Sequence, residues 1–230
     1  MTRFITLLAA ILLVNHAACA EDLAFGWWGK ATPEQVEEMI KSGKINVNKP
    51  DSLGVLPIAN AATECASPEV LDVLIKNGAD VNAEPQSDSP EAMIASYPIL
   101  KASNCPLGVV QKLVEAGADI DVAYAEGESL LAGYASSTQY PEVVKYLMEN
   151  GAHYQDLDIN GNNVLMMALY NENPVPIINT LVENGVDINM TGNDYTGKKI
   201  TVLDFAESEG KAPDILNYLR SKGAKHASEL

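Results

Sequence analysis

Residues 143–151, Val143-Val144-Lys145-Tyr146-Leu147-Met148-Glu149-Asn150-Gly151, decide the fold because their pattern recurs along the chain. Val143, Val144 and Leu147 have the spacing of one apolar helix face. Gly151 follows as a helix-ending residue, since glycine adopts the left-handed conformation without penalty. The same ending occurs at five further glycines: Gly43, Gly78, Gly117, Gly185 and Gly223. In chain order the six glycines are 35, 39, 34, 34 and 38 residues apart, which predicts six repeated helical units.

A second motif stands at the start of each later unit. Examples are Leu56-Pro57-Ile58-Ala59-Asn60-Ala61 and Thr201-Val202-Leu203-Asp204-Phe205-Ala206. Period and motif together resemble the ankyrin repeat, which has about 33 residues and the marker T-P-L-H-x-A. The resemblance implies an all-α solenoid of about six helix-turn-helix repeats with extended or β-hairpin loops. The expected repeats are approximately 21–55, 56–95, 96–128, 129–162, 163–200 and 201–230.

The chain departs from the ankyrin marker at its histidine. Other residues stand at that position in the repeats that carry the motif, namely Ala59, Leu100, Ala132, Met166 and Asp204. The hydrogen bonds that this histidine makes to neighbouring loops must therefore be replaced or missing. Two connections, 83–96 and 190–200, are longer than the others. Gly192 and Gly197 predict a loose second connection, and insertions in repeat proteins fall on loops, often on the binding face.

The first twenty residues have the form of a secretory signal peptide. Arg3 precedes an apolar run over 4–14, and Ala18-Cys19-Ala20 supplies small residues at the cleavage site. The run is too short to span a bilayer, which needs about 20 residues. We expect cleavage after Ala20, export to a bacterial periplasm and one repeat domain over 21–230. An alternative is a lipoprotein that is cut before Cys19 and lipidated there.

Charge excludes one class of partner. The chain has 15 Lys and Arg against 31 Asp and Glu, a formal net charge of −16. Removing residues 1–20 removes Arg3 and no acidic residue, so the charge becomes 14 − 31 = −17. Nucleic-acid binding depends on basic residues that release counterions, so we expect no nucleic-acid partner. We also expect no transmembrane segment and a protein that is monomeric when free, and a basic protein partner remains open.

Sequence signatures of catalysis are missing. The chain contains no C-x-x-C, H-E-x-x-H, G-x-G-x-x-G or G-x-S-x-G motif. We therefore expect no enzyme activity, no cofactor and no metal site. Cys65 and Cys105 lie nine and eight positions after Leu56 and Tyr97, at nearly equivalent places in adjacent repeats. Packed helices about 8–10 Å apart oppose a disulfide, whereas an oxidising compartment favours it, so the bridge remains open.

The resemblance also implies where a partner binds. Ankyrin arrays bind proteins on a concave side made of loop tips and the first helix of each repeat. For Trp28, closing the open end of the first repeat is an alternative role. By register, the expected partner-binding residues are Trp28, Leu53, Glu64, Ser96, Glu126, Glu128, Asn160, Asn162, Tyr170, Asn171, Asp194 and Tyr195.

Non-enzymatic protein binding is the function that these features predict. A narrower hypothesis is an immunity protein that neutralises a toxin or effector by binding it. It rests on export, small size, acidity and the lack of an attached catalytic domain. Two alternatives remain open at this stage: a periplasmic scaffold for an envelope or oxidative-stress enzyme, and a secreted effector that acts on host proteins.

Overall fold

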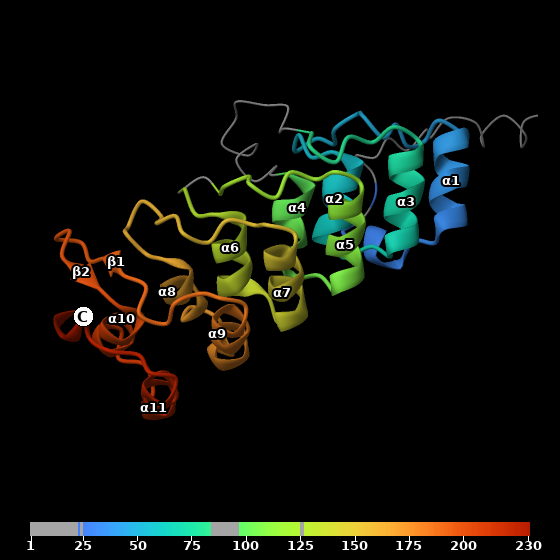
Figure 1. Cartoon of the computed structure of the whole chain (residues 1–230). Coiled ribbons are helices and arrows are strands. Elements are labelled where there is room, and N and C mark those ends of the chain that lie inside the picture. Colours follow the sequence, from blue (N-terminus) through green and yellow to red (C-terminus); the bar gives the residue numbers. More distant parts are fainter. Residues whose placement is uncertain (1–22, 24, 84–96, 125–126) are drawn as a thin grey trace, which may run out of the picture.

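The computed structural model describes residues 23, 25–83, 97–124 and 127–230. The expected signal peptide, with Cys19 and the cleavage site at Ala20, lies outside these residues. The described part forms eleven α-helices arranged as successive antiparallel pairs along a curved array (Figure 1). No helix within it has the length and apolar character needed to cross a bilayer.

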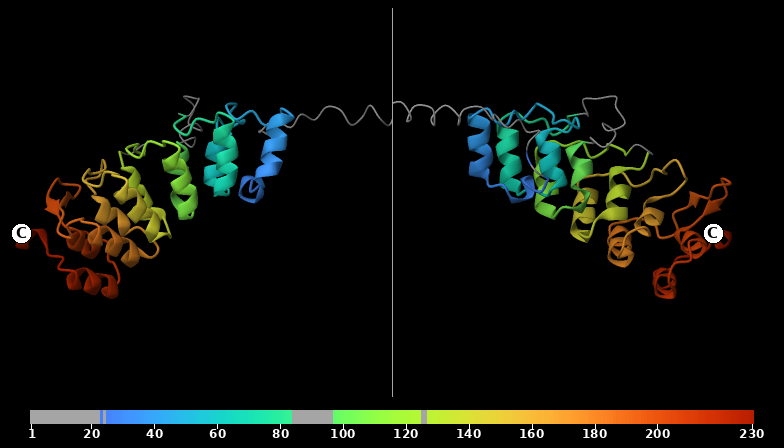
Figure 2. Two further views of the ribbon diagram at one scale, coloured as in Figure 1. Left: turned by 45° about the vertical axis from the view of Figure 1, so that its right-hand side comes forward. Right: turned by 180° about the vertical axis from the view of Figure 1, so that it is seen from behind.

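Each repeat contributes an inner helix and an outer helix. The inner helices are η2 (Trp28–Lys30), α2 (Pro57–Thr63), α4 (Pro98–Lys101) continued by η4 (Ala102–Asn104), α6 (Leu130–Ser137), α8 (Val164–Ala168) and α10 (Val202–Ser208). The outer helices are α1 (Pro33–Lys41), α3 (Pro68–Lys76), α5 (Leu107–Glu115), α7 (Pro141–Glu149), α9 (Pro174–Glu183) and α11 (Pro213–Ser221). Inner helices contact inner helices of the next repeat, as α6 contacts α8, and outer helices do the same, as α7 contacts α9. Figure 2 shows this succession of pairs from two further directions.

Local sequence sets the helix ends. Proline occupies the first turn of α7 and most other outer helices, where its missing N–H has no intrahelical partner in any case. The side chains of Thr32 and Ser129 accept hydrogen bonds from backbone N–H groups at the starts of α1 and α6. At the end of α7, Gly151 has φ +91° and Ala152 N–H bonds to the Leu147 carbonyl, the Schellman ending that the sequence predicts.

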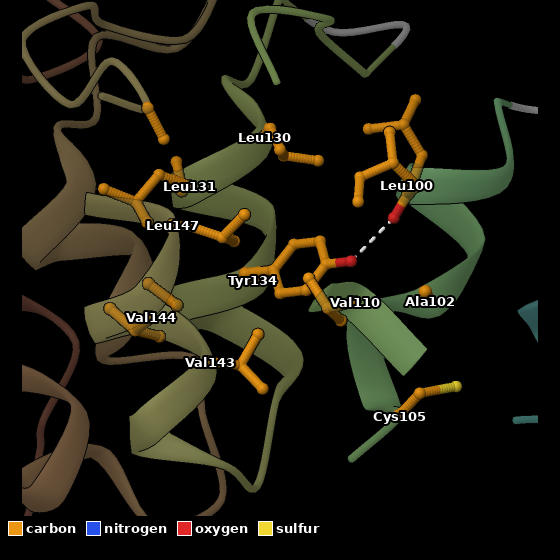
Figure 3. Close-up of a cluster of buried hydrophobic side chains, with 14 of the residues drawn as sticks. Leu100, Ala102, Cys105, Val110, Leu130, Leu131, Tyr134, Val143, Val144 and Leu147 are labelled. Atoms are coloured by element: carbon orange, nitrogen blue, oxygen red, sulfur yellow. Dashed lines mark hydrogen bonds between the residues drawn. The ribbon is translucent and has the colours of Figure 1, made fainter. Parts of the chain in front are cut away.

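A buried core runs along the array between the two helix layers. Tyr134 on α6 is fully buried, and its hydroxyl donates to the Ile99 carbonyl of the preceding repeat at 2.7 Å. Figure 3 shows this bond among buried side chains, including Val110 and Leu147 from neighbouring outer helices. Burial raises the pKa of Tyr134 well above its ordinary value. The core is thus built mainly from contacts between adjacent repeats, as stacked arrays require.

The second long connection is ordered, which corrects the expected looseness. Strand β1 (Gly192–Asn193) pairs antiparallel with β2 (Lys199–Ile200), so the connection is a short hairpin. Gly197 allows the turn of this hairpin, because its φ of +80° is a conformation that favours glycine. Most of the first long connection, 83–96, lies outside the described residues.

Candidate functional site

Three connecting loops share one turn built by an aspartate. Oδ1 of Asp158 accepts hydrogen bonds from the backbone N–H groups of Asn160 and Asn162 at 2.9 and 2.8 Å. The same atom of Asp51 binds the N–H groups two and four residues later, and so does that of Asp194. Asp-x-x-Gly is therefore a repeated turn motif that projects two residues beyond the helices. We call these three loops the hairpin tips, 51–54, 158–161 and 194–197.

Two of the tips are fixed side by side. The N–H of Asn193 donates to the Gly161 carbonyl at 2.8 Å. A Cβ added at Gly192 would lie 2.4 Å from that same oxygen, so glycine is required for the approach. The loop 157–161 and residues 193–195 line a shallow depression of about 480 Å³. The tips of the last repeats therefore form one surface.

Apolar side chains project from the hairpin tips. Tyr195 is 98% exposed, Ile159 is 74% exposed and Leu53 is 60% exposed. Leu157 lines the same depression as Ile159 and Tyr195. Apolar side chains exposed at loop tips do not pack into the core. Exposed apolar groups rimmed by polar residues mark interaction surfaces.

A second hollow lies where the inner helices of repeats four and five end. Its volume is about 730 Å³, within the range of about 300–1,000 Å³ for sites that hold small ligands. We call it the inner-helix groove. It is lined by Asn104, Ser136, Ser137, Thr138, Gln139, Pro141, Tyr170, Asn171, Glu172, Asn173, Pro176 and Ile177. Its lining is polar, with Glu172 as the charged residue.

The structure brings several of the predicted partner residues to these two surfaces. Tyr170 and Asn171 line the inner-helix groove. Asn160 and Tyr195 lie at the paired hairpin tips, and Leu53 lies at the tip of the second repeat. Glu128 is half-buried, and its backbone carbonyl accepts from Tyr124 N–H at 2.8 Å. Ser96 and Glu126 lie outside the described residues.

Four predicted partner residues make contacts within the protein. Trp28 is only 3% exposed and packs into the core, which leaves little of its side chain for a partner and agrees with the alternative of closing the first repeat. Glu64 accepts hydrogen bonds from Gly26 N–H and Gly29 N–H at 2.7 and 3.1 Å. Asn162 is buried and donates to Asp158 Oδ2. Asp194 holds its own turn, and hydrogen bonding by the Thr196 hydroxyl lowers its pKa.

Sequence reasoning missed Ile159 and Leu157. Ile159 lies within the Asp158-to-Gly161 turn, where a side chain has no core to enter. An apolar residue inside an Asp-x-x-Gly turn therefore signals an exposed apolar side chain, as Leu53 and Tyr195 also show.

The two cysteines are joined across adjacent repeats. Cys65 and Cys105 form a disulfide with Cα atoms 5.2 Å apart. The distance is shorter than helix packing allows because both residues lie in the turns that follow α2 and η4. Cys65 has φ +51°, a left-handed conformation that costs a non-glycine residue about 1 kcal/mol or more. Gly210 is the equivalent residue of the last repeat, since it lies nine residues after Thr201 as Cys65 lies nine residues after Leu56. Gly210 also has a positive φ, so this turn adopts the left-handed conformation in both repeats.

Across 23, 25–83, 97–124 and 127–230, no three His, Cys, Asp or Glu residues come together in a way that could hold a metal ion. His153 is mostly exposed, 3.4 Å from Asp121. His226 lies 2.8 Å from Asp204 at the end of the array.

Comparison with known proteins agrees with this architecture. Residues 93–192 match the family model for ankyrin repeats in three copies. The ankyrin repeat domain of human ASB11 superposes with a TM-score of 0.65 and 20% identity, covering 93% of this chain and 90% of that one. The phosphocholine transferase AnkX of Legionella pneumophila is 24% identical over 196 residues, which are 75% of this chain. The chain spans only 20% of the length of that relative. From its helix pairs, its hairpin loops and these matches, the chain folds as an ankyrin-repeat solenoid.

Proposed function

We propose that this protein is a non-enzymatic binding module that holds a protein partner on its hairpin tips and inner-helix groove. One observation carries the proposal: Ile159 and Tyr195 are largely exposed on two tips that lie side by side, because Asn193, just before the second tip, bonds to Gly161 of the first. Aromatic and large apolar residues of this kind supply most of the energy in protein interfaces. The surrounding acidic chain favours a basic partner, because opposite charge speeds association.

The proposal places the protein in the bacterial periplasm after cleavage at Ala20. The disulfide between Cys65 and Cys105 supports an oxidising compartment. Intact mass of the protein purified from its own cells distinguishes the two forms of export. A chain that begins at Glu21 supports simple cleavage, whereas a chain that begins at a lipid-modified Cys19 supports membrane anchoring. Retention of residues 1–20 would contradict both.

The narrower proposal is an immunity protein that neutralises a toxin or effector. Export, acidity and a single binding module support it. Its test is co-expression with a secreted toxin encoded beside it, in cells that the toxin kills. Protection by the wild-type protein that is lost in the Ile159→Ser/Tyr195→Ser double variant would support it. Killing that proceeds equally with the wild-type protein would refute the immunity role.

A periplasmic scaffold for an envelope or oxidative-stress enzyme and a secreted effector remain alternatives. The similarity to a phosphocholine transferase covers one fifth of that protein, so we carry over no transferase activity. A neighbouring gene for a redox enzyme, together with binding of that enzyme, would favour the scaffold.

Binding through the hairpin tips is tested with matched variants. The Ile159→Ser/Tyr195→Ser protein removes the two exposed apolar groups without touching the core. Leu230→Ser is the control, because Leu230 is also exposed, at 62%, but lies at the chain end. The partner captured by the wild-type protein should bind the control equally and the double variant at least tenfold more weakly. Equal binding by all three proteins would show that the tips are not the binding surface.

A further inference from the structure

The inner-helix groove has many of its hydrogen-bond donors directed into the protein. The hydroxyls of Ser136 and Ser137 both donate to the Gly133 carbonyl, at 2.9 and 2.7 Å. A serine hydroxyl has one hydrogen and two lone pairs. Both oxygens can therefore only accept hydrogen bonds from a ligand in the groove.

The amide side chains of the groove follow the same pattern. Nδ2 of Asn171 donates to the carbonyls of Ala135 and Thr138, at 3.2 and 2.8 Å, which uses both of its hydrogens. Nε2 of Gln139 donates to the Tyr140 hydroxyl at 3.2 Å. Oε1 of Gln139 and Oδ1 of Asn171 remain as acceptors, the second of them shared with Asn173 N–H at 2.9 Å.

Charges of both signs surround the groove. Glu172 adds an exposed carboxylate to the lining. The pKa of Tyr170 is raised by its partial burial and by the nearby carboxylates of Glu209 and Asp158. The Tyr170 ring already holds one cation, since Lys211 Nζ lies 5.5 Å from its centroid. With Lys211 already at the Tyr170 ring, the Glu172 carboxylate is the lining group that attracts a further cationic side chain.

We infer that the inner-helix groove receives an arginine side chain of the protein partner. The inference rests on the proposed binding function and adds the chemistry of one contact. A guanidinium group has five N–H donors and no acceptor, which suits a groove that offers serine, amide and carboxylate oxygens. Arginine fits better than lysine, because its planar fork can reach several acceptors at once. Asn104 and Asn173 also line the groove.

The test uses a small probe and needs no partner. N-acetyl-arginine amide is titrated into the ¹⁵N-labelled protein and followed by NMR. Saturable shifts are expected at the backbone amides of residues 136, 137 and 172. N-acetyl-citrulline amide has the same shape without the charge and should bind at least threefold more weakly. Equal binding of both probes, or shifts confined to other surfaces, would overturn the inference.

Matched variants separate a local contact from general charge attraction. Glu172→Gln removes the groove carboxylate and should weaken the arginine probe about threefold, as loss of one exposed ion pair does. Glu149→Gln changes the net charge equally on the exposed side of α7, where Glu149 pairs with Lys145 at 3.7 Å, and should leave affinity unchanged. Equal weakening by both variants would overturn the inference.

The two proposals fail in different ways. If the arginine probe does not bind but the tip variant still loses the partner, the groove assignment is wrong and the binding function stands. If the probe binds in the groove but the tips have no effect on any partner, the proposed use of the tips is wrong.

Discussion

Nδ1 of His226 lies 2.8 Å from Oδ1 of Asp204, and this contact attaches the C-terminal segment to the last inner helix. Asp204 stands where the ankyrin marker has its histidine. Its Oδ2 accepts from the backbone N–H groups of Thr201 and Ala227, both at 2.9 Å. An acid thus replaces the marker histidine at this position, and a histidine from the tail completes the network.

Removing this carboxylate should loosen the end of the array. Partial burial opposes ionisation of Asp204, but hydrogen bonds from Thr201, Ala227 and His226 outweigh it and lower the pKa to about 2. Because that shift corresponds to about 2 kcal/mol, Asp204→Asn should cost about 1–2 kcal/mol. Hydrogen exchange should be faster in α10, α11 and the tail, with repeats two to four unchanged. Uniform acceleration throughout the chain would contradict a local role.

The contact between His226 and Asp204 also predicts a pH dependence. The hydrogen bond to Asp204 raises the pKa of His226, aided by the charges of Glu207, Asp204 and Glu229 and opposed by partial burial. A raised histidine pKa gives stability that is complete below about pH 6.5 and lost as pH rises through the folded value. The Asp204 contribution is complete above about pH 4 and lost as pH falls toward 2. Arg220 bonds to Glu207 on the same side.

Comparison of two histidine variants measures this effect. His226→Gln should destabilise the C-terminal repeat by about 0.5–1 kcal/mol at pH 5–6, because exposed pairs are screened, and by much less at pH 9. His153→Gln is the control, since His153 lies 3.4 Å from Asp121 and is mostly exposed. A loss from His226→Gln that stays constant between pH 5 and 9 would show that the charge is not involved.

The helix pairs could be predicted from sequence because their signals are local. Apolar spacing and glycine at helix ends act within one repeat, and each is found where it was expected. The role of Glu64 could not be predicted, because its partners Gly26 and Gly29 are 38 and 35 residues away. Sequence register places Glu64 on the concave side but does not reveal what covers it.

Register alone also does not show which of the expected partner residues reach the surface. Trp28 lies in the single-turn helix η2 and is only 3% exposed. Tyr195 is exposed because a loop tip leaves its side chain in solvent regardless of neighbours. Ile159 was overlooked because its turn was considered through the polar Asn160 alone.

Removal of the disulfide should destabilise the junction between repeats two and three. The bridge closes a sequence separation of 40 residues, for which loop-closure entropy gives roughly 4 kcal/mol and measured values are commonly about 2–4 kcal/mol. Cys65→Ser/Cys105→Ser should therefore unfold at lower temperature, and added reductant should lower the wild-type value toward that of the variant. Two reactive thiols in the denatured, unreduced wild-type protein would show that the bridge is absent.

Gly133 should tolerate no side chain. A Cβ at this position would lie 2.1 Å from a carbon of the Tyr124 ring, and the Tyr124 hydroxyl is fixed to the Leu100 carbonyl at 3.2 Å. Gly133→Ala should thus cost about 1–3 kcal/mol, as overpacking does. Gly108→Ala is the control, because its Cβ would lie 3.2 Å from the Pro68 ring and alanine favours a helix. Thermal unfolding compares them, and equal stability of the two variants would refute the role of Tyr124.

Glu64 should hold the first repeat in place. Its two carboxylate oxygens accept from Gly26 N–H and Gly29 N–H, so Glu64→Ala leaves two donors without this partner and should cost about 1–3 kcal/mol locally. Tryptophan fluorescence reports this repeat selectively, because Trp27 and Trp28 are the two tryptophans of the chain. In a denaturant titration the fluorescence transition should move to lower concentration, whereas the far-UV circular dichroism transition should move little. Glu69→Ala, at an exposed position on α3, is the control. If both variants leave the fluorescence transition unchanged, Glu64 does not anchor the first repeat.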